Sequence, residues 1–324
     1  MQKLLSRMLA AAFAIAAISA ALAADAPYPA KVVRMRLPFP PGGPTDLLGR
    51  VVGQKLTENL GQPVVIDNRP GAGGNVGTDY ASKQAPDGYT IVLVSPALAI
   101  SPSLYKKLGY DPVKDLTMVS LVAQIPNVLL VHPSVPARTL KDFVQLARGN
   151  PGTLNFGSGG VGTGQHLAGE MLNVLTKIKL VHVPYKGSNQ AMMGMIGGQI
   201  EMVVIGIPSA VQQVQAGRVR ALAVLAGERS PMLPNVPTSK EAGFAGFEVL
   251  SWYGIAAPAG TPREIVARLS GELNKIMKSA DGRERLTAAG FDPAFSTPEY
   301  FSEFLQSEIM RYAKVVKAAG IQPE

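Results

Sequence analysis

Apolar and polar positions along the chain follow two periods in turn, one typical of strands and one typical of helices. Residues 31–38 alternate apolar with basic side chains and predict a strand. Residues 47–60 place leucine and valine on one face, end before Gly61, and predict a helix. Residues 63–67 and 89–95 predict further strands, and a Gly-rich segment at 71–77 leads into a short helix at 78–83.

The same succession continues to the end of the chain. Predicted strands cover residues 127–131, 154–158, 180–184, 200–205, 219–225 and 248–255. Predicted helices cover residues 139–148, 163–175, 189–196, 209–216, 262–279 and 298–319. Strands that alternate with helices predict an α/β fold with mostly parallel sheets, in which ligands bind beyond the carboxyl ends of the strands. The 324 residues suggest about two domains, at roughly 100–200 residues each.

The first 23 residues have the features of a cleavable signal peptide. Lys3 and Arg7 precede an apolar run at 8–24, which contains the small-x-small site Ala21-Leu22-Ala23. A membrane anchor is the alternative, but the run is shorter than the ~20 residues of a spanning helix. The sequence has no cysteine, which excludes disulfides, thiolate metal sites and a lipid-modified N-terminus. We therefore expect an exported, periplasmic protein.

The net charge of +8 does not indicate nucleic-acid binding. Its basic residues are scattered rather than clustered, and aromatic residues make up only 6% of the chain. Loss of the signal peptide removes two positive charges and leaves +6. A mild positive field that attracts anionic small molecules is consistent with this balance.

Three strand-to-helix turns share glycine, hydroxyl side chains and few charges; they span residues 41–46, 157–164 and 185–189. Glycine lets backbone amides approach a ligand, and the first amides of a helix lack partners and carry partial positive charge. Thr45, Ser158, Thr163 and Ser188 add hydroxyl donors. The turns predict an anion pocket built mainly from neutral donors. The alternative is that the glycines close turns and the hydroxyls cap helices.

Motifs for other chemistries are missing. The sequence lacks the phosphate loop G-x-x-x-x-G-K-[ST], the G-x-S-x-G elbow and H-E-x-x-H. The run from Gly160 to Gly164 reads G-x-G-x-G, which is not the dinucleotide spacing, and it lies in the middle of the chain. The three histidines lack ligand spacing, so we expect neither metal nor cofactor. His166, just after a Gly-rich turn, is a candidate contact with a structural role as its alternative. Asp46 is either a ligand contact or an acid that stabilises the first turn of its helix.

Several segments together resemble one family, the Bordetella uptake gene (Bug) family of extracytoplasmic solute receptors of tripartite tricarboxylate transporters. The similar segments are Phe39-Pro40-Pro41-Gly42-Gly43-x-x-Asp46, residues 64–74, Pro86-Asp87-Gly88-Tyr89-Thr90, residues 105–112, Asn155-Phe156-Gly157-Ser158-Gly159, Val183-Pro184-Tyr185-Lys186-Gly187 and Pro234-x-Val236-Pro237-Thr238. They span nearly the whole mature chain in order.

The resemblance implies a type II periplasmic-binding-protein fold, with two α/β lobes joined by crossover strands. Lobe one would hold residues 24–121 plus 228–324, and lobe two residues 122–227. The protein would be a monomer that binds a small carboxylate without reaction and delivers it to the membrane permease subunits. Carried over by motif, the ligand-binding residues are Pro41, Gly42, Gly43, Thr45, Ala97, Ser158, Gly159, Gly162, Thr163, Lys186, Gly187 and Ser188. The segment 95–101, which holds Ala97, would be a loop.

One departure concerns the segment before Pro208. Many relatives carry an acidic residue and an asparagine there, whereas this chain has Gly206 and Ile207. Without an acid at Ile207 to pair with an ammonium group, we expect a di- or tricarboxylate or an aromatic carboxylate rather than an amino acid. Two alternatives are a solute sensor that acts on a signalling partner and an exported hydrolase that uses Ser158 and His166.

Overall fold

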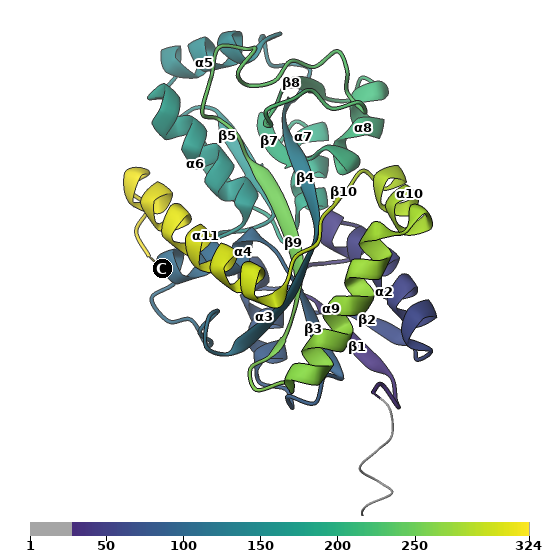
Figure 1. Cartoon of the computed structure of the whole chain (residues 1–324). Helices are drawn as coiled ribbons and strands as arrows, with labels where there is room; N and C mark the ends of the chain where they lie inside the picture. Colours follow the sequence, from purple (N-terminus) through teal and green to yellow (C-terminus); the bar gives the residue numbers. More distant parts are fainter. Residues whose placement is uncertain (1–27, 324) are drawn as a thin grey trace, which may run out of the picture.

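A computed structural model describes residues 28–323, so the predicted signal peptide lies outside the described residues. One mixed sheet runs through the molecule in the strand order β2-β1-β3-β9-β4-β7-β5-β6, with β10 (Asp292–Pro293) and β8 each paired to β4. We call the part around β1, β2 and β3 the first half and the part around β5, β6, β7 and β8 the second half (Figure 1).

The first half has β1 (Val33–Leu37) in parallel with β2 (Val64–Asn68) and β3 (Thr90–Val94). Its helices are α2 (Pro44–Leu60), α3 (Asn75–Ser82), α4 (Pro96–Leu104), α9 (Arg263–Lys278), α10 (Ala280–Ala288) and α11 (Pro298–Ala318), with a short turn η1 (Ala72–Gly74). Neighbouring β3 residues alternate between two hydrophobic clusters, Ile91 and Leu93 in one and Val92 and Val94 in the other. Since side chains alternate across a strand, each face of the sheet has its own core.

The second half repeats this arrangement with β5 (Asn155–Ser158) in parallel with β6 (Val181–Pro184) and β7 (Met202–Gly206). Its other elements are α5 (Leu140–Gly149), α6 (Gly164–Thr176), α7 (Ser188–Ile196), α8 (Ile207–Gln215) and β8 (Arg220–Val224). Phe143 and Phe156 are fully buried on one face, and Met195 and Ile205 lie in the cluster on the other. The second half thus has clusters of its own, although Leu167 of α6 lies in a first-half cluster.

Two long strands join the halves, β4 (Leu116–Val131) and β9 (Leu250–Pro258), as Figure 1 shows. They pair with each other in an antiparallel manner, while residues 127–131 of β4 pair with β7 in the second half. Register shifts between Met118 and Ser120 and between Leu121 and Ala123 mark bulges, which bend a strand. The sheet is therefore parallel within each half and antiparallel at the crossover.

Most predicted elements are confirmed to within a few residues, and three differ. The segment 95–101, expected as a loop, is mostly helix α4, which begins at Pro96 and contains Pro102. The strand expected at 127–131 is only the end of β4, whose earlier residues are buried on both faces and show no alternation. Helix α10, polar along most of its length, was not predicted.

The segment that precedes β9 packs with the second half. Leu233 and Val236 lie in one second-half cluster, and Phe247 and Val249 lie in the other. This segment belongs to the residues from 228 onward that the family resemblance implies for lobe one. Because these apolar side chains fill the second-half core, the chain returns to the first half only along β9.

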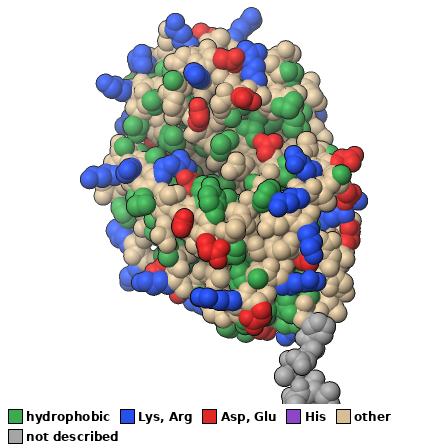
Figure 2. All heavy atoms as spheres, viewed as in Figure 1, with side chains coloured by type: hydrophobic (Ala, Val, Ile, Leu, Met, Phe, Trp, Pro, Cys, Tyr) green, Lys and Arg blue, Asp and Glu red, His purple; other side chains and the backbone are tan. Residues whose placement is uncertain are grey.

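Within the described residues, no helix has both the length and the apolar character needed to cross a bilayer. On the face drawn in Figure 2, lysine and arginine side chains are interspersed with aspartate and glutamate rather than gathered into one patch. This distribution fits the scattered basic residues of the sequence.

Candidate ligand-binding cleft

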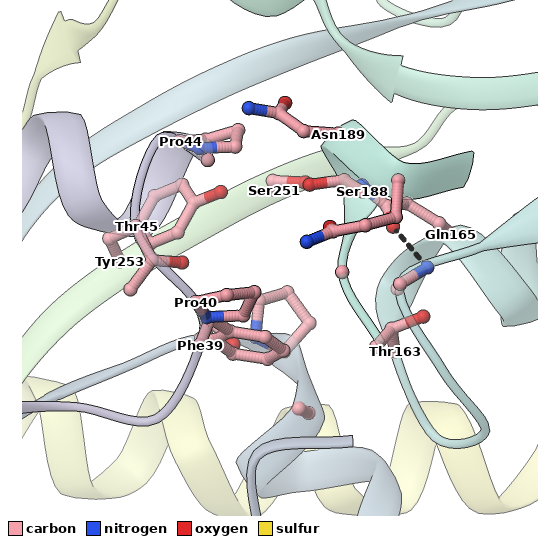
Figure 3. Close-up of a pocket in the computed structure, with 18 of the residues that line it drawn as sticks. Phe39, Pro40, Pro44, Thr45, Thr163, Gln165, Ser188, Asn189, Ser251 and Tyr253 are labelled. Atoms are coloured by element: carbon pink, nitrogen blue, oxygen red, sulfur yellow. Dashed lines mark hydrogen bonds between the residues drawn. The ribbon is translucent and has the colours of Figure 1, made fainter. Parts of the chain in front are cut away.

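A pocket of about 600 Å³, including the solvent at its mouth, lies between the halves beyond the carboxyl ends of β1, β3, β5 and β6; we call it the cleft pocket. Loops from both halves and two residues of β9 surround it (Figure 3). Its lining residues are Phe39, Pro40, Pro41, Gly43, Pro44, Thr45, Ser95, Pro96, Ala97, Gly159, Thr163, Gly164, Gln165, Gly187, Ser188, Asn189, Gln190, Ser251 and Tyr253. None of these carries a charged side chain, so any attraction for an anion must come mainly from peptide and side-chain dipoles.

Four helices, α2, α4, α6 and α7, begin at this pocket. Among them, only α6 has a side-chain cap, from Thr163, whose Oγ1 accepts a hydrogen bond from the His166 amide at 3.3 Å. The first amides of a helix have no acceptor within that helix, and its dipole places partial positive charge there. The three other N-termini therefore present uncapped amides to one space, which suits a carboxylate.

The β1–α2 loop is held from behind by Asp46, which is buried. Its carboxylate accepts hydrogen bonds from the Gly42 amide at 3.0 Å, from Arg50 at 2.9 and 3.1 Å and from Asn68 Nδ2 at 3.1 Å. Burial alone would raise the pKa of Asp46, but the bonds from Arg50, Gly42 and Asn68 outweigh it and hold the pKa below its usual range. Asp46 is thus ionised, shapes the loop and does not line the pocket.

The β5–α6 loop is fixed by its own polar side chains. Gln165 Oε1 accepts a hydrogen bond from the Gly159 amide at 2.9 Å, drawn as the dashed line in Figure 3. The hydroxyls of Ser158 and Thr163 both lie within hydrogen-bond distance of the Gly160 carbonyl oxygen, at 3.0 and 2.8 Å. Ser158 is almost fully buried, so its side chain stabilises the loop and does not reach the pocket.

Two histidines stack behind this loop. The ring centroids of His166 and His182 are 4.0 Å apart, and Phe156 stacks on His182 at 4.9 Å. Burial lowers the pKa of His166 to about 4. Burial and the neighbouring His166 lower the pKa of His182 to about 3. Both rings are therefore neutral at pH 7, and Ser158 Oγ lies 2.7 Å from His182 Nε2 rather than beside His166.

The crossover strand β9 supplies two polar groups that the sequence analysis missed, Ser251 and Tyr253. Burial raises the pKa of Tyr253, and hydrogen bonding to Ser251 and Thr45 offsets this in part, so the phenol is neutral. Asn127 Nδ2 on β4 lies 3.0 Å from Ser251 Oγ. One crossover strand, β9, therefore lines the pocket, and the other, β4, contacts a residue of that lining.

The structure brings eight of the predicted ligand residues together in the lining: Pro41, Gly43, Thr45, Ala97, Gly159, Thr163, Gly187 and Ser188. Four other predicted contacts lie outside it. Ser158 faces its own loop, the Gly42 amide binds Asp46, and the Gly162 amide lies 3.4 Å from His166 Nδ1. Lys186 lines an adjoining cavity.

Three further candidates, Asp46, His166 and Ile207, also lie outside the lining. Asp46 and His166 have the roles described above. Ile207 begins helix α8 and is buried in a hydrophobic cluster of the second half. Asp46 and His166 thus support the loops that form the pocket walls, and a short sequence motif does not distinguish such a role from direct contact with a ligand.

The halves touch each other around the pocket. Asn189 Nδ2 on α7 donates to the Gly42 carbonyl oxygen at 2.6 Å, and the Tyr105 hydroxyl donates to the Val161 carbonyl oxygen at 3.1 Å. A Cβ at Gly187 would lie only 2.7 Å from Pro40 Cγ of the other half. The structure is therefore that of a closed cleft.

An α/β fold of two halves joined by crossover strands, with strand-end loops around a neutral cavity, is that of a periplasmic binding protein. The model of the tripartite tricarboxylate transporter family receptor, TctC, matches residues 48–321. The chain belongs to this family, which includes the Bug proteins.

Three solved structures are similar over most of the chain. Rpa4515 of R. palustris with adipate is 36% identical, covers 92% of this chain and all of that chain, and has a TM-score of 0.88. Periplasmic binding protein BugD is 32% identical, with coverage of 92% and 100% and a TM-score of 0.86. MatC (Rpa3494) from Rhodopseudomonas palustris with bound malate is 34% identical, with coverage of 89% and 100% and a TM-score of 0.83.

Proposed function

We propose that this protein is a periplasmic receptor that captures a small carboxylate between two lobes and delivers it to the permease of a tripartite tricarboxylate-type transporter. The observation that carries the proposal is the convergence of uncapped helix N-termini from both halves on one uncharged pocket. The adipate and malate bound by two similar proteins support this class of ligand.

Capture would proceed by closure of the two lobes about β4 and β9. We propose that residues from 24 to about 121, with the chain from β9 onward, form one lobe, and that the segment between them forms the other. A micromolar ligand supplies about 8 kcal/mol of binding free energy. This exceeds the few kcal/mol that usually separate two conformations of one protein, so the ligand can hold the closed form.

Delivery to a permease and action on a sensor both require recognition of the closed form, so the sensor stays an alternative. We propose no catalytic step. The hydrolase alternative needs an accessible Ser158 next to His166, whereas the Ser158 hydroxyl is buried and lies beside His182. Export by a cleaved signal peptide and a monomeric state are part of the proposal.

Thermal unfolding and calorimetry with a panel of carboxylates and amino acids test the function. A ligand at about 100 times its dissociation constant should raise the free energy of unfolding by about 2.7 kcal/mol. Tight binding of an amino acid with no binding of any di- or tricarboxylate would reject the proposed ligand class. Absence of binding by every acid would reject the receptor itself.

A charge placed at one helix N-terminus tests the mechanism. Ser188→Asp puts a carboxylate at the start of α7 inside the cleft pocket, so we expect at least a tenfold loss of affinity for the best acid. Thr297→Asp is the matched control, because it also replaces a hydroxyl by a carboxylate at a helix N-terminus, the exposed N-cap of α11, outside the pocket. Equal effects of the two variants would contradict a carboxylate site at α7.

A further inference from the structure

A second and larger space, about 1260 Å³ with the solvent to which it opens, adjoins the cleft pocket; we call it the side chamber. Phe39, Pro40, Gly159 and Gln190 line both cavities. A molecule whose carboxylate occupies the cleft pocket could therefore extend past these residues into the side chamber. Because the two spaces lie side by side and share these walls, together they suit an elongated acid.

The walls of the side chamber differ in chemistry from those of the cleft pocket. Pro70, Tyr105, Val161 and Tyr185 provide apolar and aromatic surface. Lys186 is the one charged residue among the described residues that line the chamber. Its side chain is exposed, and no ion pair is found for it within residues 28–323. The chamber thus combines an apolar wall with an unpaired cation.

One wall of the side chamber has an unusual backbone. Gly71, Ala72, Gly73 and Gly74 all have positive φ, at 143°, 46°, 63° and 104°. Ala72 is one of only two non-glycine residues with positive φ in the described part of the chain. Strained backbone of this kind persists where the surrounding fold holds it, often at ligand sites. Here the small side chains of the turn leave the chamber open.

On the basis of the proposed function, we propose that the side chamber binds the distal end of an elongated α,ω-dicarboxylate, with Lys186 as the residue that recognises the second carboxylate. One carboxylate binds the helix N-termini in the cleft pocket. The carbon chain crosses between Phe39 and Gly159, and the second carboxylate pairs with the Lys186 ammonium group. The receptor thereby distinguishes long diacids from monoacids and from short diacids.

Calorimetry with the saturated diacids from malonate to suberate, and with monoacids of equal length, tests this inference. The full mature chain should bind adipate or a longer diacid at least tenfold more tightly than hexanoate. Lys186→Gln should remove this preference and change succinate affinity by less than about twofold. Lys179→Gln is the matched control, because Lys179 is an exposed lysine of the same half that lines neither cavity.

A charge reversal adds a second readout. Lys186→Glu should favour 6-aminohexanoate over adipate, because the ammonium end would then meet a carboxylate. Equal loss of succinate and adipate in Lys186→Gln, or the same loss in Lys179→Gln, would overturn the assigned role of Lys186. Binding of short diacids without any gain for longer ones would overturn the side chamber but leave the receptor function intact. Absence of binding by any acid would overturn both.

Discussion

Closure of the cleft can be tested at Gly73, where the two halves leave no room for a side chain. A Cβ at Gly73 would overlap the carbonyl oxygen of Val161 in the other half. Gly73 has φ of +63°, a conformation that side chains other than glycine rarely adopt. Gly61, at the end of α2, has a similar φ of +69°, but no atom lies within 4 Å of its Cβ position. Gly73→Ala and Gly61→Ala therefore have a similar energetic cost from the left-handed backbone, but only Gly73→Ala places a methyl group against the other half.

The two costs act on different equilibria. A left-handed alanine costs about 1–2 kcal/mol in any folded form, so both variants lose stability and neither loses affinity for this reason. The overlap with Val161 exists only in the closed form, and overpacking of this kind costs about 1–3 kcal/mol. Since 1.4 kcal/mol is a factor of ten in affinity, Gly73→Ala should weaken ligand binding by roughly 5-fold to 150-fold.

Calorimetry with adipate, or with the best acid of the panel, measures the affinity of both variants, and thermal unfolding without ligand measures their stability. We expect similar melting temperatures for the two variants and weaker binding only in Gly73→Ala. Equal affinities in both variants would refute the contact between Gly73 and Val161 in the bound form. An equal loss of affinity in Gly61→Ala would assign the effect to general destabilisation instead.

Three further predictions follow from the loops behind the cleft pocket. Asp46→Asn weakens the hydrogen bonds from Arg50 and the Gly42 amide. It should lower the free energy of unfolding, measured by urea denaturation, by about 1–3 kcal/mol, and it should also lower ligand affinity. Thr163→Val removes the cap of α6 and should cost about 0.5–2 kcal/mol by the same measurement. The pKa values of His166 and His182, lowered to about 4 and 3, imply that the unfolded chain takes up protons first as the pH falls below 6.5. The free energy of unfolding should therefore fall between pH 6.5 and 4, by on the order of 3 kcal/mol for each of the two histidines, and His182→Gln should flatten this curve. A flat curve for the unmodified protein would contradict neutral buried histidines.

The sequence alone determined the succession of strands and helices and the positions of the Gly-rich turns. The reason is that both depend on local properties, namely the period of apolar side chains and the conformational freedom of glycine. The convergence of these turns was also predictable, because the carboxyl ends of parallel strands lie at one edge of a sheet. Pro41, Gly43, Gly159 and Gly187 were found in this way.

Only the tertiary structure decided which groups face the cleft pocket and which support it. Ser158 and Thr163 share one Gly-rich turn, but one hydroxyl is buried behind the loop and the other residue lines the pocket. Ser251 and Tyr253 reach the pocket because β9 crosses between the halves. There β9 pairs with β4, although paired residues of the two strands are more than 120 positions apart in the sequence. Local periodicity carries no information on such distant pairing or on the direction of a loop side chain, since packing across the whole sheet decides both.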